Sequence, residues 1–444
     1  MKHSLLKTYI KYVSLNIMGM IALSCYILAD TYFISKALGA TGLAALNLSI
    51  SIYSVIHGIG LMIGIGGSTR FSILKAQSNN HRAEIVFSTS IKAGVLVSIL
   101  FVMVGLFGSR FLALTLGANQ QTLPLTISYL STILIFAPFF ILNNIILAFV
   151  RNDNNPKLSM VAMLIGSFSN IILDYVFMFP LKMGMFGAAF ATGLAPIISL
   201  GILLIHFAKK KNAFAFLKSK LQWRSLPDVL SLGLSALIIE ISSAVVLITY
   251  NLVILNIEGN MGVAAYGIVA NIALVGIAVF TGIAQGIQPL ISKYYGMQKY
   301  DLVKRVRTYA ILTAISIAIM IYLCILFYSD DIIRIFNSEN NLEIARIAKI
   351  GLKIYFAGFL FVGINIVTAM FLSATENAGD AFYITIARGL VLIIPLVLLL
   401  SNIYQMIGVW SSFVVTEFLV TILAIVIMKV RNKSLWTKGI SNNH

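Results

Sequence analysis

Charged residues are scarce in this chain, and acidic residues are the scarcest. Only 11% of the 444 residues are Asp, Glu, Lys or Arg, whereas soluble domains carry about 25%. Hydrophobic residues make up 59% of the sequence, and the mean hydropathy is +0.96. This composition excludes an ordinary soluble protein and predicts a chain that crosses a membrane many times.

Cysteines are few, and a nucleotide-binding signature is missing. Cys25 and Cys324 both fall in apolar runs, where we expect buried thiols, so a disulfide framework and a zinc site are excluded. The chain has no G-x-x-x-x-G-K-[ST] motif and no long polar segment that could form a nucleotide-binding domain. We therefore expect no cofactor and no enzyme activity, and any uphill transport must draw on an ion gradient.

Twelve apolar segments are long enough to cross a bilayer, which takes about 20 residues of helix. The basic start, Met1 to Lys11, leads into a long apolar run without a small-residue cleavage site, so we interpret this run as the first membrane helix. The sequence thus predicts an all-α membrane protein with transmembrane helices near 10–34, 43–67, 86–110, 125–150, 157–180, 186–208, 228–256, 263–290, 305–328, 347–374, 381–401 and 405–429.

Basic residues are distributed unequally between the two sides of the predicted membrane. With twelve spans, 25 of the 32 Lys and Arg residues fall at the termini and in the even-numbered loops. The other side holds seven, which are Lys36, Arg110, Lys182, Arg334, Arg346, Lys349 and Lys353. The positive-inside rule therefore predicts that both termini are cytoplasmic. It also explains the net charge of +17 without a nucleic-acid partner.

The two halves of the chain repeat one another. The segment 39–46 reappears as 259–266 at an offset of 220, and further matched pairs are Gly66 with Gly286, Asn144 with Asn365, and Gly187 with Gly408. We therefore expect residues 1–208 and 228–444 to form two six-helix bundles with the same orientation in the membrane, as in many transporters. The Lys-rich segment 209–227 between them is expected to be a solvated cytoplasmic linker.

Acidic side chains occur within the predicted spans. Asn170 and Asp174 are four residues apart, so they share one face of a helix. A carboxylate at membrane depth is unfavourable by at least a few kcal/mol, and such residues normally face a protein interior or a water-filled cavity. A polar contact between two helices is the alternative. We favour proton or ion binding because other polar residues lie at matching depths.

The motifs in their order resemble those of the multidrug and toxic compound extrusion (MATE) transporters, particularly bacterial ones, of the MOP superfamily. The resemblance covers essentially the whole chain and depends on the segments 28–34, 39–45, 170–174, 185–189 and 286–290. It implies two pseudo-symmetric bundles of six helices. It also implies a monomeric antiporter in the bacterial cytoplasmic membrane that exchanges H⁺ or Na⁺ for organic, amphipathic cationic solutes, including drugs.

The resemblance also implies a cation site in the first bundle. Its residues would be Asp30, Asn144, Asn170, Asp174 and Thr192, with Asn143 as an alternative to Asn144 and with Asp30 and Asp174 as the candidate Na⁺ ligands. Hard oxygen ligands suit H⁺ or Na⁺ better than a transition metal. In the second half Glu240, Asn365 and Glu417 form a further candidate polar site, for which functional and structural roles both stay open. His57 is interpreted as a packed, hydrogen-bonded residue.

Two other functions compete with the antiporter. A lipid-linked oligosaccharide flippase of the same superfamily would line its cavity with Arg or Lys, and the sequence predicts no basic residue deep in a span. A non-transporting membrane receptor or assembly factor would not need two sets of buried acids. Both arguments favour a transporter whose partners are a small organic substrate and the lipid bilayer.

Overall fold

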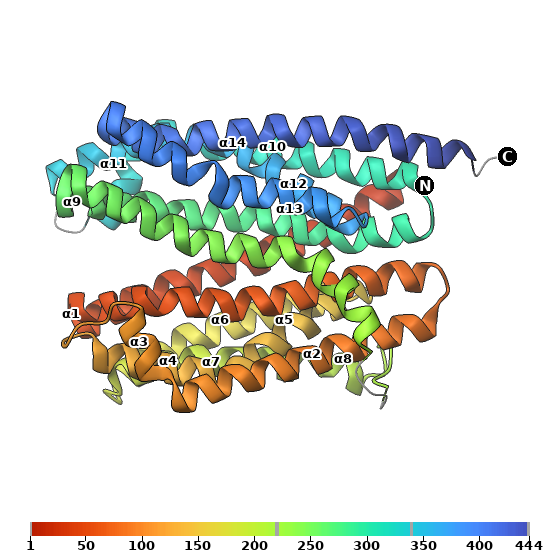
Figure 1. Cartoon of the computed structure of the whole chain (residues 1–444), viewed down its shortest axis with the longest axis horizontal. Coiled ribbons are helices and arrows are strands. Elements are labelled where there is room, and N and C mark those ends of the chain that lie inside the picture. Colours follow the sequence, from red (N-terminus) through yellow and green to blue (C-terminus); the bar gives the residue numbers. More distant parts are fainter. Residues whose placement is uncertain (1, 218–221, 338–340, 442–444) are drawn as a thin grey trace. The chain divides into compact units, whose positions relative to one another are not determined.

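The computed structural model describes residues 2–217, 222–337 and 341–441, and this part of the chain contains helices and no strand (Figure 1). Lys218 and Lys220, which contribute to the predicted charge bias, lie outside it. The helices are α1 (Lys2–Ala76), α2 (Asn80–Phe107), α3 (Ser109–Thr115), α4 (Leu123–Ile135), α5 (Ala137–Asn152), α6 (Pro156–Met178), α7 (Gly184–Leu203), α8 (Ile205–Ala208), η1 (Trp223–Ser225), α9 (Leu226–Gly296), α10 (Tyr300–Phe336), α11 (Leu342–Tyr355), η2 (Phe356–Gly358), α12 (Phe359–Ala374), α13 (Ala378–Ile386), η3 (Ala387–Val391) and α14 (Ile393–Ser441).

The number of membrane spans agrees with the sequence prediction. Eight helical segments of the described chain are long and apolar enough to cross a membrane, and α4 with α5 forms a ninth span bent by 47°. Three of the nine segments contain a non-helical residue and are long enough for two crossings. These residues are Gly39 in α1, Gly259 in α9 and Gln405 in α14. Counted as two spans each, the three bring the total to the predicted twelve.

The turns between spans repeat in the two halves. Gly39 has φ 64° and ψ −156°, and Gly259 has φ 59° and ψ −150°. This region of backbone space is open almost only to glycine. Ser78 and Gln298, also 220 residues apart, have φ values of 60° and 59°. The sequence repeat is therefore also a repeat of backbone geometry.

The described chain forms two compact units, which we call the N-terminal unit (Ser14–Ile241) and the C-terminal unit (Met1–Val13 with Ser242–His444). These limits differ from the expected boundaries at 208 and 228, because each half sends the start of its first helix into the other unit. A side chain at Gly66 would overlap the carbonyl oxygen of Val229 in α9. At Gly286 a Cβ would lie 2.8 Å from Val13 Cα in α1. The two repeat-related glycines thus make the same kind of close helix contact.

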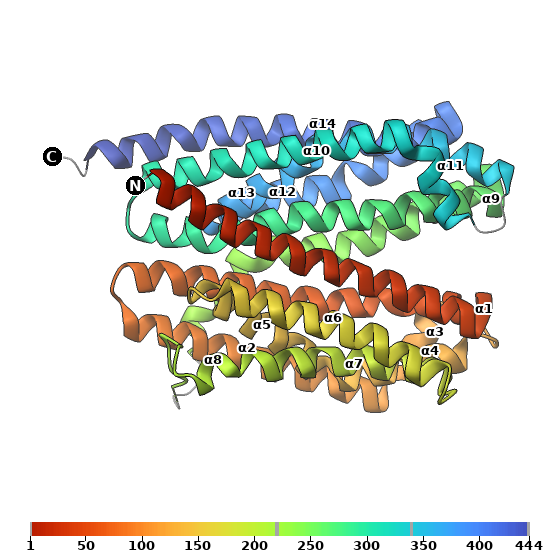
Figure 2. The same cartoon turned by 180° about the vertical axis from the view of Figure 1, so that it is seen from behind.

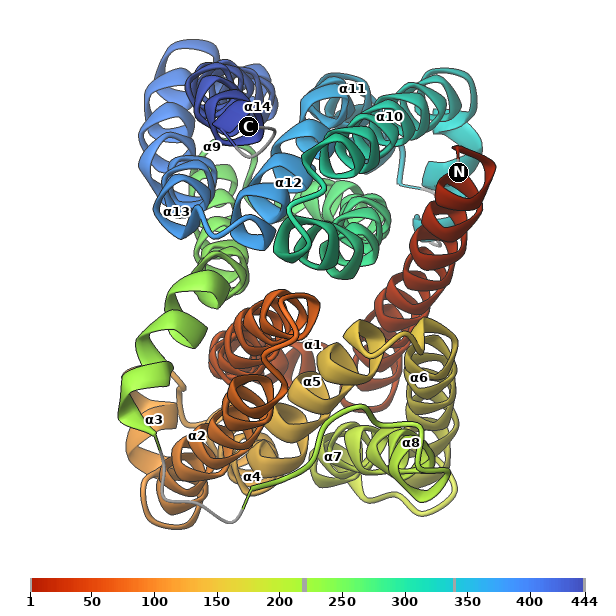
Figure 3. The same ribbon diagram turned by 90° about the vertical axis from the view of Figure 1, so that its right-hand side faces the viewer.

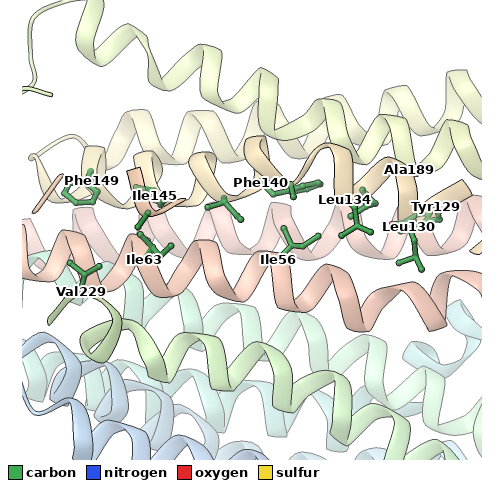
Figure 4. Close-up of a cluster of buried hydrophobic side chains, with 14 of the residues drawn as sticks. Ile56, Ile63, Tyr129, Leu130, Leu134, Phe140, Ile145, Phe149, Ala189 and Val229 are labelled. Carbon is green, nitrogen blue, oxygen red and sulfur yellow. The ribbon is translucent and has the colours of Figure 1, made fainter. Parts of the chain in front are cut away.

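In the core of the N-terminal unit, the part of α1 that follows Gly39 packs against α4 and α5. Ile56 and Ile63 of α1 face Phe140 and Ile145 of α5, as Figure 4 shows. Contact in a membrane protein depends on close packing more than on the exclusion of water. Glycines of α1 permit this close packing. An added Cβ at Gly60 would lie 2.9 Å from the Asn144 amide nitrogen, so the backbones of α1 and α5 approach closely.

Helices α6 and α7 lie side by side in the N-terminal unit (Figures 2 and 3). Gly166 of α6 permits this contact, because a Cβ added there would lie 3.3 Å from the Ala195 carbonyl oxygen of α7. One turn further along α6 lies Asn170, which the same contact places beside Thr192. The packing of small residues therefore positions the polar side chains of the predicted site.

The segment after α8 is not the fully solvated linker that the sequence predicted. Phe214 is buried and contacts the rings of Phe71, Phe87 and Phe149. The Asp153 carboxylate accepts a hydrogen bond of 2.7 Å from the Ala213 backbone N–H. The lysines dominate the composition of this segment, but its single buried aromatic side chain fixes it to the N-terminal unit.

The expectation of buried thiols was also wrong. Cys25 and Cys324 are both free and exposed on helix surfaces. An apolar run does not reveal whether a cysteine is buried, because a helix that faces lipid is as apolar as one that faces the core.

The predicted orientation can be tested by cysteine labelling in a Cys25→Ala, Cys324→Ala background. Lys210→Cys is expected to resist an impermeant maleimide added to intact cells and to react after permeabilisation, because the charge bias puts this exposed position in the cytoplasm. The exposed Lys182→Cys is the matched position on the opposite side and should react without permeabilisation. The reverse pattern would overturn the orientation.

Candidate functional site

The predicted cation-site residues come from four helices of the N-terminal unit. Asp30 lies in the part of α1 that precedes Gly39. Asn144 lies in α5, Asn170 and Asp174 in α6, and Thr192 in α7. Asn170 and Asp174 are fully buried, and Thr192 and Asp30 are 3% and 6% exposed. Polar side chains buried to this degree require partners for their hydrogen-bonding groups.

The Asn170 amide connects Asp174 to Thr192. In one orientation its nitrogen lies 3.4 Å from the Thr192 hydroxyl. Rotated by 180°, the amide donates to Asp174 Oδ2 at 3.0 Å and accepts from the Thr192 backbone N–H at 3.3 Å. The second orientation satisfies both ends of the amide and gives the carboxylate a donor. The i, i+4 spacing noted in the sequence is therefore used as a direct side-chain contact.

The two aspartates leave acceptor atoms without partners. Asp30 Oδ1 and Asp174 Oδ1 are buried, and neither has a hydrogen-bond partner in the described structure. The two carboxylates interact electrostatically with each other. A buried ionised carboxylate without a partner is strongly unfavourable, so such oxygens need a proton or a cation. Their donor set, made of carboxylate, amide and hydroxyl groups, fits H⁺ or Na⁺.

Tyrosines complete this cluster, and one of them was missed from the sequence. Tyr129 of α4 is buried, hydrogen-bonds with Thr192, and interacts electrostatically with both Asp30 and Asp174. No sequence signal marks it, because α4 is apolar and a bend separates it from α5. Tyr26, one turn before Asp30, meets the hydroxyl of Tyr53 at 2.7 Å.

The helix α5 asparagines are placed less directly. The Asn144 amide donates to the backbone carbonyl oxygen of His57, in the part of α1 that follows Gly39, at 3.4 Å. Asn143 Oδ1 is buried and has no hydrogen-bond partner within the described chain. Both side chains therefore remain candidates for the asparagine that α5 would contribute to the predicted cation site.

Two of the three second-half candidates meet inside the C-terminal unit. Glu417 of α14 accepts from the Asn365 amide at 2.7 Å and from Arg388 Nε at 2.6 Å. The Asn365 amide oxygen accepts from the Thr421 hydroxyl at 2.9 Å. Each carboxylate oxygen of Glu417 thus has a strong donor, and one of them is a cation.

Arg388 contradicts the expectation that no basic residue lies deep in a span. It belongs to the π-helical turn η3, about 15 Å along from the start of α13 at 1.5 Å per residue. Its side chain is 14% exposed and that of Glu417 is 1% exposed. A cation already paired with a buried carboxylate is not available for a pyrophosphate group, so Arg388 gives no support to the flippase.

Glu240, the third candidate, lies in the N-terminal unit. Its carboxylate is 3.6 Å from His57 Nδ1, and the imidazole stacks on the ring of Tyr53. His57 is therefore packed, as expected, but it also faces an acid that the sequence could not place beside it.

Known proteins resemble this chain along most of its length. The sequence model of the MatE family matches residues 16–176 and 236–399. The multidrug export protein MepA of Staphylococcus saprophyticus is 27% identical over 405 residues, which are 91% of this chain and 89% of that protein. MepA of Staphylococcus aureus strain MRSA252 is 26% identical over the same shares.

Solved structures show the same fold. A crystal structure of MATE in complex with MaL6 has a TM-score of 0.92 and 22% identity, with 97% of each chain covered. An outward-facing conformation of a multidrug resistance MATE family transporter of the MOP superfamily has a TM-score of 0.91 and 22% identity, covering 97% of this chain and 96% of that one. The predicted all-α fold is therefore confirmed.

The role of the Arg388–Glu417 pair can be tested by stability. Arg388→Met leaves the Glu417 carboxylate buried without its cation, so the free energy of unfolding should fall by about 3–5 kcal/mol. Adding Glu417→Gln removes the charge and keeps an acceptor for Asn365, so the double variant should recover most of the loss. Unfolding midpoints in detergent measure both. Equal midpoints for the wild type and the single variant would show that the pair does not stabilise the fold.

Proposed function

The chain belongs to the MatE family, and we propose that it is a secondary antiporter that exports organic, amphipathic cations, including drugs, in exchange for H⁺ or Na⁺. It is a membrane transporter and not an enzyme. Its relatives named as multidrug export proteins support drug efflux as the direction and class of transport. The exchange of an ion is supported by the site described above.

One observation carries the proposal, namely the two unpartnered carboxylate oxygens of Asp30 and Asp174. Two carboxylates that interact in the interior of a membrane helix bundle cannot both stay ionised without a counter-charge. A proton or a sodium ion supplies it and is drawn from a gradient across the membrane. The two groups then titrate as a pair, and neither has a value of its own.

Ion binding can alter the packing of α6 and α7 through Asn170. An ionised Asp174 accepts from the Asn170 amide, whereas a protonated one can donate to it. Reversal of this contact changes which atom of the Asn170 amide faces Thr192 on α7. Neutralisation of a buried pair is therefore a local switch that can bias a two-state bundle.

The C-terminal unit is proposed to take no coupling ion at Glu417. Arg388 already neutralises that carboxylate, and Asn365 satisfies its second oxygen. In this proposal the acids of the N-terminal unit bind an exchangeable cation, whereas Glu417 in the C-terminal unit is neutralised by the arginine side chain of Arg388. Coupling is assigned to the N-terminal unit alone.

The location and orientation follow from the same family and from the charge bias. We place the chain in the cytoplasmic membrane of a bacterium as a monomer, with both termini in the cytoplasm. In this orientation the ion enters from outside and the organic cation leaves from the cytoplasmic side or the inner leaflet.

The coupling site is tested by Asp174→Asn and, separately, Asp30→Asn. Each amide is nearly isosteric with the carboxylate but can neither exchange a proton nor offer a charge to Na⁺. Gradient-driven efflux of a fluorescent organic cation from reconstituted vesicles should fall to the level of protein-free vesicles. The matched control is Asp331→Asn, the same change at a side chain that is 67% exposed, and it should pump normally.

Folding and substrate binding should survive in both variants, because each removes a buried charge without adding volume. Binding of the same cation in detergent is measured in parallel. If both variants pump at wild-type rates, the aspartates are structural and the coupling site lies elsewhere.

A further inference from the structure

An apolar cavity of about 380 Å³ lies in the N-terminal unit, and none of its lining residues belongs to the candidate cation site. Its walls come from α2, α5, the junction of α7 with α8, and the segment 212–216. Asn212 is the one polar residue that lines it in the described chain. The volume falls within the range of small-molecule sites, which is about 300–1,000 Å³. The cavity is therefore large enough to take part of a ligand.

Hydrogen bonds hold the segment that closes one side of the cavity, residues 212–217, which we call the strap. The Leu217 backbone N–H donates to the Ser88 hydroxyl of α2 at 2.8 Å. The Leu217 carbonyl oxygen accepts from Lys92 Nζ, also of α2, at 3.0 Å. The Ala213 carbonyl oxygen accepts from Lys75 Nζ of α1 at 2.6 Å. The strap therefore forms a fixed wall of the cavity.

The rim of the cavity exposes large apolar side chains at the depth of the lipid chains. Leu204 is 55% exposed and Phe216 is 50% exposed. On α2 the lining residues Phe87 and Ile91 lie about 10 and 16 Å from Asn80, at 1.5 Å per residue. A helix of 28 residues is about as long as the full bilayer is thick, so these positions lie in the outer part of the hydrocarbon layer. We therefore expect an occupant that comes from the bilayer.

Three exposed lysines, at 209–211, interrupt the wall of the cavity. They stand in the chain between Phe207 and Asn212, and both of these neighbours line the cavity. The backbone of this turn is fixed, because the Lys210 N–H donates to the Phe207 carbonyl oxygen at 2.9 Å, as at the end of a helix. None of the three lysines forms an ion pair with another described residue. An apolar cavity and a cluster of positive charge without an acidic partner are thus adjacent.

We propose that the cavity binds one acyl chain of an anionic phospholipid and that the lysines at 209–211 bind its phosphate group. Their ammonium groups donate charge-assisted hydrogen bonds of the kind that phosphate oxygens accept. The cytoplasmic leaflet is the anionic one, and it attracts basic clusters at the cytoplasmic ends of membrane helices. The choice of this leaflet rests on the proposed orientation, whereas the site itself does not.

A phospholipid fits these observations better than other ligands do. An organic cation would be repelled by the three lysines. A soluble anion such as inorganic phosphate would contact the lysines and leave the apolar cavity without an occupant. A phospholipid matches both parts of the site, because its apolar chain and its charged group are covalently joined.

The test is native mass spectrometry of the purified, delipidated full-length protein in a neutral detergent, titrated with dioleoyl phosphatidylglycerol. The dissociation constant of the first bound lipid should be lower than that of dioleoyl phosphatidylcholine, which carries no net charge. In a triple lysine variant, Lys209→Gln with Lys210→Gln and Lys211→Gln, the phosphatidylglycerol constant should rise by about tenfold or more, since each basic residue contributes about fivefold. The phosphatidylcholine constant should change little.

The matched control removes the same charge from three basic side chains of the same unit that the charge bias puts on the opposite side. It combines Lys36→Gln, Arg110→Gln and Lys182→Gln. All three residues are exposed, and Lys182 shares the positive φ of Lys210. This control variant should bind phosphatidylglycerol as tightly as the wild type does.

A second variant tests the cavity itself. Ala215→Trp adds an indole ring at a residue that lines the cavity and is exposed, so the ring can enter the cavity without disturbing the core. Each buried methylene of a lipid chain contributes about fourfold to binding, so displacement of two should weaken phosphatidylglycerol binding by about fifteenfold. Ala208→Trp, at an exposed residue that does not line the cavity, should bind as the wild type does. Size-exclusion profiles confirm that each variant is folded.

The proposal is overturned if the triple lysine variant or Ala215→Trp binds phosphatidylglycerol as tightly as the wild type. Equal binding of the two lipids by the wild type would also overturn it. Displacement of phosphatidylglycerol by glycerophosphoglycerol, its headgroup without acyl chains, would show a site for a soluble anion and refute the phospholipid. These measurements use no gradient and no organic cation, so a failure of the proposed antiport would leave their outcome unchanged.

Discussion

The need to neutralise carboxylates inside a membrane protein determines most of this structure. The deep acids differ in the side chains that lie beside them. Glu417 has the guanidinium of Arg388, Glu240 has the imidazole of His57, and the pair Asp30 and Asp174 has no side-chain cation among the described residues. Because a buried charge without a partner is so unfavourable, Arg388 serves as the fixed counter-ion of Glu417, and we propose that an exchangeable ion neutralises Asp30 and Asp174.

The duplicated architecture is therefore used unequally. The repeat preserves backbone features, such as the left-handed turns at Gly39 and Gly259 and the close helix contacts at Gly66 and Gly286. It does not preserve the side chains that carry charge. In the coupling that we propose, only the N-terminal unit responds to the ion, because Arg388 already neutralises Glu417 in the C-terminal unit.

The sequence could predict features that depend on local spacing or on the repeat. The twelve spans, the Gly39–Gly259 correspondence and the shared face of Asn170 and Asp174 are of this kind. It could not predict contacts made across helices far apart in the chain. Tyr129 lies in an apolar segment with no marking pattern, and the pairing of His57 with Glu240 joins residues 183 positions apart.

Two of the predictions made from the sequence were wrong for the same physical reason. The sequence predicted no basic residue deep in a span, and it could not mark Arg388 as an exception because its buried partner, Glu417, lies in another helix. The segment around Phe214 was taken as solvated because its composition is basic, although one aromatic side chain decides its packing. In both cases a single contact outweighed the average character of the segment.

The central claim is that Asp30 and Asp174 hold an ion that the substrate displaces. The direct measurement is the release of H⁺ and of Na⁺, followed in parallel with two indicators, when an organic cation is added to the protein in weak buffer. Because coupling between two ligands is reciprocal, we predict release of one of the two ions from the wild type, and no release from the Asp30→Asn, Asp174→Asn double variant. Binding without release of either ion, or equal release from the variant, would contradict the account.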